Sequence, residues 1–286
     1  MDQLEGLNGL ITPPLARRGL MMSSLITGLT LAATRVEAQV IHTDAQGIIA
    51  QEVIVPTKDG PLPGYFARPD GPGPYPIVLV NEEIFGVHDY IRDVCRRLAK
   101  LGYAAVAVEI YARLADLSKI EDAGDIIRSV LPRAADAQVI SDSEAAITYA
   151  GNHLGDINRV GAVGFCRGGR NVWMLDAAST RLKAAVAFYG PVGGNRTPLQ
   201  PETVTDIAAR IHAPLLGLYA GKDPGIPVPD IEQAVTAAKV AGRTVELVIY
   251  PDAGHGFHAD YRPSYRPEAA ADGWARMLAW FKRYGV

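Results

Sequence analysis

One of the two cysteines in this chain, Cys166, lies among glycines at the end of an apolar run, in the stretch RVGAVGFCRGGR. A strand that runs into a tight glycine turn and then a helix is the setting of a nucleophile elbow, whose usual form is G-x-S-x-G. That serine motif occurs nowhere in the chain. A cysteine at this position predicts a thiolate nucleophile if a base takes its proton, and a small structural residue is the alternative.

Two further reactive residues follow apolar, strand-like runs. Asp223 comes after PLLGLYAGK and His255 after VELVIYPDAG, so the chain order is Cys, Asp, His. Nucleophile, acid and histidine follow one another in this order in α/β-hydrolases. The carboxyl ends of parallel strands meet at one edge of a sheet, which predicts that the three side chains form a triad. In it, His255 would take the proton of Cys166, and Asp223 would orient the imidazole.

Metal binding is not predicted. His255 and His258 have no third ligand at a useful spacing, and the zinc motif H-E-x-x-H is absent. The net charge of −3 gives no reason to expect nucleic-acid binding. Two cysteines do not make a disulfide framework, and Cys95 lies in a helical pattern that fits a buried apolar residue. The expected partner is a small molecule.

Short β-rich runs alternate with helical stretches from residue 45 onward. Repeated strand–helix alternation predicts an α/β fold with a mostly parallel twisted sheet and helices on both faces, formed by one domain over residues 45–286. Two early strands are expected to form a hairpin across residues 58–60, and Pro132 is expected to break the helical region 119–151. The strand-like runs are QEVIVPT, PGYFARP, YPIVLVNEE, YAAVAVEIY, NRVGAVGF, LKAAVAFYG, APLLGLYAGKD and RTVELVIYPDA.

The first 38 residues have the pattern of an export signal. Arg17 and Arg18 precede an apolar stretch at residues 19–33, and small residues follow at 36–38. The arginine pair indicates the twin-arginine route, which predicts a periplasmic or secreted protein. The apolar stretch is shorter than the roughly 20 residues that span a bilayer, so no stable membrane insertion is expected. An ordinary amphipathic helix is the alternative.

Several motifs together resemble the dienelactone hydrolase (carboxymethylenebutenolidase) family from residue 51 to the C-terminus. They are NEEIFG, EIYAR, G-x-C-x-G-G, GKDP and GHGF. The resemblance implies an α/β-hydrolase fold, no cofactor, and a Cys-His-Asp triad that opens lactone rings through an acyl-enzyme thioester. By position, the nucleophile is Cys166, the base His255 and its orienter Asp223.

The same resemblance assigns the remaining site residues. Glu83 would interact with the resting thiol and help to activate it, although Glu82 is a rival because successive strand residues face opposite ways. The oxyanion donors would be the backbone N–H groups of Ile84 and Arg167. Tyr111 and Arg113 match a Y-x-R motif that helps to hold an anionic substrate.

One position departs from the family. A second arginine of the anion clamp would fall four residues after the histidine, where this chain has Ala259. Arg262 and Arg266 are candidates to replace it. With one clamp arginine missing, the sequence predicts a preference for neutral esters or lactones over carboxylated ones.

Two alternative functions remain open at this point. The first is a non-catalytic α/β-hydrolase scaffold that binds a small molecule, against which the intact set of Cys166, Asp223 and His255 argues. The second is a redox sensor, which needs a resolving cysteine, and Cys95 is the one candidate.

Overall fold

The structure is a computed structural model, and it describes residues 40–286. The expected export signal at residues 1–38 lies outside the described residues. Within residues 40–286, no helix has the length and apolar character needed to cross a membrane.

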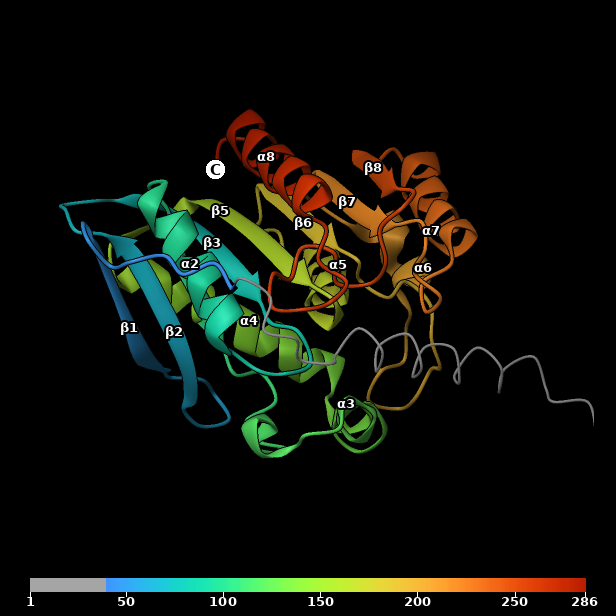
Figure 1. The fold of residues 1–286 in the computed structure, drawn as a ribbon, viewed down its shortest axis with the longest axis horizontal. Coiled ribbons are helices and arrows are strands. Elements are labelled where there is room, and N and C mark those ends of the chain that lie inside the picture. Colours follow the sequence, from blue (N-terminus) through green and yellow to red (C-terminus); the bar gives the residue numbers. More distant parts are fainter. Residues whose placement is uncertain (1–39) are drawn as a thin grey trace, which may run out of the picture.

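An eight-stranded sheet forms the centre of the molecule, in the order β1-β2-β4-β3-β5-β6-β7-β8 (Figure 1). β1 and β2 form the expected antiparallel hairpin, and β2 also pairs antiparallel with β4. The pairs from β4 across to β8 are parallel. The strands are β1 Ile48–Val55, β2 Leu62–Pro69, β3 Tyr75–Asn81, β4 Ala104–Val108, β5 Gly155–Phe165, β6 Ala184–Phe188, β7 Leu215–Ala220 and β8 Val245–Tyr250.

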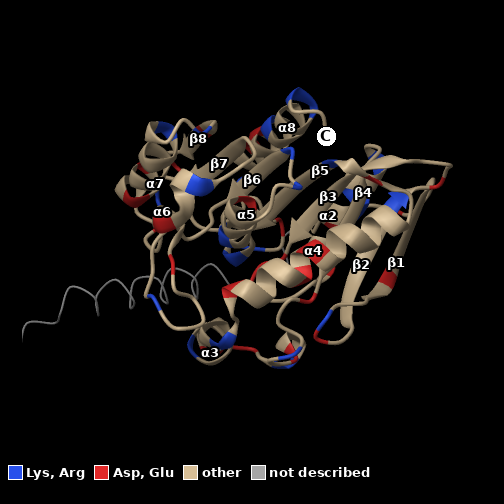
Figure 2. Cartoon of the chain, turned by 180° about the vertical axis from the view of Figure 1, so that it is seen from behind, with Lys and Arg blue, Asp and Glu red and all other residues tan. Residues whose placement is uncertain are grey.

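Helices cover both faces of this sheet, as the sequence predicted. α2 and α8 lie on one face and α4 and α5 on the other, as the two opposite views show (Figures 1 and 2). The charged residues of both signs are scattered over helices and loops (Figure 2). The helices are α2 Asp89–Lys100, α3 Ala123–Asp125, α4 Asp136–Asn152, α5 Arg167–Ala178, α6 Val204–Ile207, α7 Val228–Val240 and α8 Pro267–Arg283.

The central strands are buried on both faces, which is why they read as continuous apolar runs. Every residue of β4, β6 and β7 is buried. The helical region 119–151 is broken as expected, because a 3₁₀ turn that contains Pro132 separates the short α3 region from α4. β3, β4, β5, β7 and β8 run parallel, so their carboxyl ends lie at one edge of the sheet, and the predicted site residues follow these ends.

Candidate active site

Cys166 occupies a strained turn between β5 and α5. Its φ of 55° and ψ of −122° lie where residues with a side chain are rarely found, at a cost of about 1–3 kcal/mol. A side chain at Gly164 would collide with the backbone carbonyl of Gly168 one turn later. The glycines therefore allow the sharp bend that points the Cys166 side chain away from the strand.

The start of α5 is pressed against the ends of two neighbouring strands. A Cβ atom at Gly168 would collide with the carbonyl oxygens of Asn81 and Glu82, and one at Gly169 would lie 2.7 Å from the carbonyl oxygen of Phe188. Arg167 is the first residue of α5, so its N–H has no partner within the helix. Ile84 lies in the turn after β3.

His255 and Asp223 form a buried pair. The His255 Nδ1 atom lies 2.6 Å from Asp223 Oδ2, and both side chains are about 3% exposed. Burial lowers the pKa of His255, but the negative charges of the Cys166 sulfur and the Asp223 carboxylate outweigh it and raise that pKa to about 10. Because the Cys166 sulfur acts on the pKa of His255, the sulfur lies close to the imidazole.

Glu83 is held by three side chains of the site. Arg262 Nη2 donates to its Oε1 atom at 2.9 Å, and the Tyr261 hydroxyl donates to Oε2 at 2.5 Å. His88 Nε2 lies 3.3 Å from Oε2. Burial raises the pKa of Glu83, but the Arg262 charge and these hydrogen bonds outweigh it and lower that pKa to about 2.

Glu82 points in another direction. Its Oε1 atom accepts a hydrogen bond from the backbone N–H of Ile110 at 2.9 Å, just beyond β4. Burial and the nearby Glu109 raise the pKa of Glu82 well above its ordinary value. The structure therefore places Glu83, rather than its rival Glu82, against the loop that carries His255.

Arg113 is not brought to Cys166. Its guanidinium donates to the Asp142 carboxylate on α4 at 2.7 Å, and to the Thr57 hydroxyl and the Gly60 carbonyl in the β1–β2 turn. Asp142 and the hairpin turn thus engage the side chain, and a role of Arg113 in holding the substrate stays a prediction. The side chain of Tyr111, two residues earlier, is fully buried.

The two arginines that could replace the missing clamp residue, Arg262 and Arg266, differ in their partners. Arg262 is buried and paired with Glu83, whereas Arg266 donates to the backbone carbonyls of Pro263 and Tyr265 at the start of α8. Ala259 is itself fully buried. Only Arg262 therefore lies beside the predicted site.

Comparisons with known proteins show the family of the chain. A model of the "Dienelactone hydrolase family" matches residues 62–285. Two relatives share the name "Putative carboxymethylenebutenolidase". The one from Methylorubrum extorquens is 50% identical over 274 residues, covering 95% of this chain and 94% of its own, and the one from Escherichia coli K12 is 41% identical over 266 residues, covering 93% and 98%.

A solved structure extends the likeness to three dimensions. The "Putative Dienelactone Hydrolase" from Klebsiella pneumoniae superposes with a TM-score of 0.81 at 46% identity, covering 83% of this chain and 99% of its own. The chain belongs to the dienelactone hydrolase family. It is therefore a hydrolase with the α/β-hydrolase fold that acts on lactone or carboxylic ester bonds.

Some residues around the triad were not singled out from the sequence. The ring of Tyr189, just after β6, lies 5.2 Å from that of His255, and its φ is 37°. His88 and Tyr261 contact Glu83. Tyr189 follows a strand-like run, as Asp223 and His255 do. Its position at a strand end could therefore have indicated from the sequence that it lies near the site.

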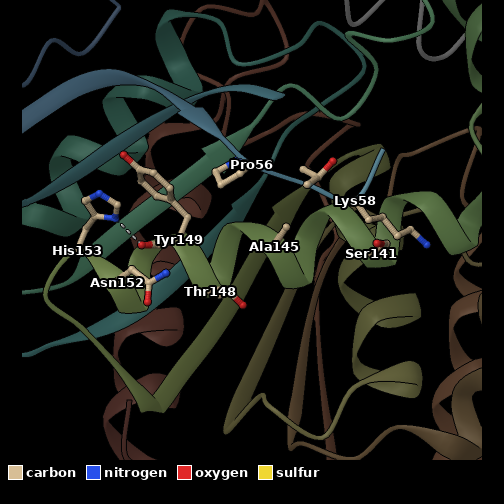
Figure 3. A pocket seen from close by; sticks show the side chains of 9 residues that line it. Pro56, Lys58, Ser141, Ala145, Thr148, Tyr149, Asn152 and His153 are labelled. Atoms are coloured by element: carbon tan, nitrogen blue, oxygen red, sulfur yellow. Dashed lines mark hydrogen bonds between the residues drawn. The ribbon is translucent and has the colours of Figure 1, made fainter. Parts of the chain in front are cut away.

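Cys166, Asp223 and His255 line neither of two surface cavities in the described part of the chain. One, of about 480 Å³, lies between the β1–β2 turn and α4, where the Tyr149 and His153 rings stack at 4.0 Å (Figure 3). The other, of about 490 Å³, lies between the end of β8 and the start of α8. In residues 40–286, no three His, Cys, Asp or Glu side chains are grouped to hold a metal ion, and both cysteines are free and buried.

Proposed function

We propose that Cys166 is the nucleophile of a lactone or ester hydrolase that works through an acyl-enzyme thioester. Its sulfur attacks the substrate carbonyl carbon, and the negative charge moves to the carbonyl oxygen. The C–O bond then breaks, and His255 gives its proton to the departing alkoxide. A water molecule attacks the thioester, His255 takes its proton, and the C–S bond breaks to release the acid and restore Cys166.

The observation that carries this proposal is the arrangement of Cys166, His255 and Asp223 at the strained turn. A buried imidazole would ordinarily lose its proton, yet the charges of its two partners raise the pKa of His255 to about 10. These two negative charges favour the protonated imidazole, and a charged imidazole in turn stabilises a thiolate beside it. The N–H groups of Arg167 and Ile84 are proposed to hold the developing oxyanion.

Glu83 is proposed to position Arg262 and Tyr261 around the nucleophile. Its carboxylate stays ionised because its pKa is about 2, and it accepts hydrogen bonds from both side chains. The activating role that the family resemblance implies for Glu83 would require substrate to draw it away from Arg262.

The proposal is tested by trapping the acyl-enzyme. We expect p-nitrophenyl acetate to give an early burst of p-nitrophenolate and an acetylated protein whose modification maps to Cys166 by peptide mass spectrometry. Cys166→Ala should give neither, and Cys166→Ser should lose most activity because a hydroxyl is far harder to ionise than a thiol. Cys95→Ala is the matched control and should keep the burst. Turnover that survives in Cys166→Ala would reject the nucleophile and favour another site or a scaffold role.

We also propose that the protein is exported by the twin-arginine route, on the basis of Arg17 and Arg18 before the apolar stretch. Replacing both with Lys should retain the protein in the cytoplasm, as measured by immunoblotting of cell fractions. The matched control is a Lys pair at Arg96 and Arg97, on α2 outside the signal region. Unchanged export of the first variant would contradict the proposal.

A further inference from the structure

The loop that carries His255 has no regular secondary structure between the end of β8 and the start of α8. Between residues 256 and 266, its backbone hydrogen bonds join residues of the loop to one another. Such bonds shape the loop but do not fix it relative to Cys166, which lies between β5 and α5. The position of the loop therefore depends on the side chains that anchor it to neighbouring elements.

Asp260 anchors this loop to α2. Its side chain is 1% exposed, and its Oδ2 atom accepts a hydrogen bond from Arg97 Nη2 at 2.6 Å. The next two residues, Tyr261 and Arg262, donate to the carboxylate of Glu83. Three successive residues of the loop thus bind α2 and the glutamate of the site at the same time.

Arg97 is itself held by Asp93, one helical turn earlier on α2. Arg97 Nε lies 2.5 Å from Asp93 Oδ2, and Arg96 Nη2 donates to Asp93 Oδ1 at 2.9 Å. The two arginine side chains are 12% and 16% exposed, and the carboxylates of Asp93 and Asp260 are 1% exposed. Two positive and two negative charges thus form a buried cluster, in which the loss of one charge leaves its partner unpaired.

Residues 41–44, which we call the strap, complete this cluster, and Figure 1 shows the start of the described chain crossing α2. The backbone N–H of Thr43 donates to Asp93 Oδ1 at 2.6 Å, and its hydroxyl to Oδ2 at 3.3 Å. Burial raises the pKa of Asp260, and the backbone of Ile41 is among the groups that partly offset that rise. The strap therefore lies against both buried carboxylates.

The position of the loop matters because two of its side chains, His255 and Arg262, lie near the Cys166 sulfur. Burial lowers the pKa of each, and the charge of this sulfur is among those that raise it. Both positive groups would move with the loop. A misplacement of about 1 Å at a reacting group can cost about a hundredfold in rate, even when its cause lies far from the chemistry.

We propose that the strap, acting through Arg97 and Asp260, positions His255 against Cys166. Arg97 and Asp260 are positioning residues, because they act through the loop and touch no reacting atom. The strap precedes the part of the chain that the family model matches, so it adds to the common domain of the family. The inference rests on the proposed function, because it takes Cys166 as the nucleophile.

The test compares Asp260→Asn, which keeps the shape of the side chain and removes its charge, with Asp89→Asn on the same helix face of the solvent. Asp89 is the matched control because its side chain is 91% exposed. The first turnover of p-nitrophenyl acetate, followed by stopped flow, gives the rate constant of acylation and the ester concentration that half-saturates it. Asp260→Asn should lower the rate constant about tenfold to a hundredfold and change the half-saturating concentration little. Asp89→Asn should change neither.

Thr43→Pro removes both donors of the strap and should lower the same rate constant severalfold. The double variant should be no slower than Asp260→Asn, because the strap acts through Asp260, whereas independent effects would multiply. Circular dichroism checks folding, and Thr43→Pro decides the matter if Asp260→Asn does not fold.

Equal rate constants in Asp260→Asn and Asp89→Asn, or multiplied losses in the double variant, would overturn the inference, even if the variants unfold at a lower temperature. Cys166→Ala tests the proposed function separately. A first turnover that survives in it would reject Cys166 as the nucleophile, whatever the strap variants do.

Discussion

His255 and His258 lie on one loop after β8, and both rings are buried, yet their surroundings act on them in opposite directions. His255 faces the sulfur of Cys166 and the carboxylate of Asp223, and its pKa is raised to about 10. For His258, burial and the nearby Arg97 charge lower the pKa to about 3. Burial alone would lower both values, so the charges of the neighbours decide which histidine holds a proton.

The partners of His258 are those of a packed, neutral ring. Its Nδ1 atom lies 2.6 Å from the Tyr90 hydroxyl on α2. It stacks on the rings of Phe165 and Trp274, with centroids 5.2 and 5.8 Å away. His258 therefore ties the loop to the helices on one face of the sheet. Two histidines three positions apart thus have different surroundings, which fit the chemical task that we propose for His255 and a structural one for His258.

Replacing the two histidines separately should give the largest contrast between them. His255→Ala should lower kcat/KM on a good ester by at least about a thousandfold, since triad residues act as a unit. His258→Phe keeps an aromatic ring in the stack and should reduce kcat/KM far less. Steady-state kinetics on one p-nitrophenyl ester, with both variants checked for folding by circular dichroism, measures the difference. Comparable losses in the two variants would contradict the division of tasks.

The positions of Cys166, Asp223 and His255 could be predicted from the sequence, because strand ends are easy to locate, whereas the surroundings of His258 could not. Apolar runs end just before Cys166, Asp223 and His255, and parallel strands bring such ends to one edge. The fold class, the hairpin and the helix break near Pro132 could also be predicted, because each depends on a local sequence pattern. The structure confirms all three.

The charged residues around the triad were harder to predict, because their directions depend on distant partners. Arg113 donates to Asp142, which lies 29 positions later in the chain. Arg262 pairs with Glu83, 179 positions away. A long side chain has many rotamers of similar energy, and the nearest opposite charge in the folded protein selects among them. Nothing in the local sequence reveals that charge.

The smallest expected effect is on the free energy of unfolding at acidic pH. It tests whether the fold keeps His258 neutral while His255 is charged. Its pKa is about 3 in the fold, against an ordinary value of 6.5. Between these pH values the unfolded chain binds a proton that the folded protein does not. The free energy of unfolding therefore falls as the pH drops from about 6.5 toward 3, by at most about 1.4 kcal/mol per pH unit from this group. The groups that act on the ring are Tyr90, Arg97 and Glu83.

His258→Phe removes this proton site but leaves the Tyr90 hydroxyl without its partner, at a cost of about 1–3 kcal/mol. We expect the variant to be less stable than the unmodified protein at pH 7.5, and its deficit to narrow as the pH falls toward 4. Urea unfolding followed by circular dichroism at several pH values measures this. His42→Gln, at an exposed position, is the control and should keep the original pH slope. Parallel slopes for His258→Phe and the unmodified protein would show that His258 is not held neutral by the fold, because a ring that titrates normally adds no difference between the folded and unfolded states.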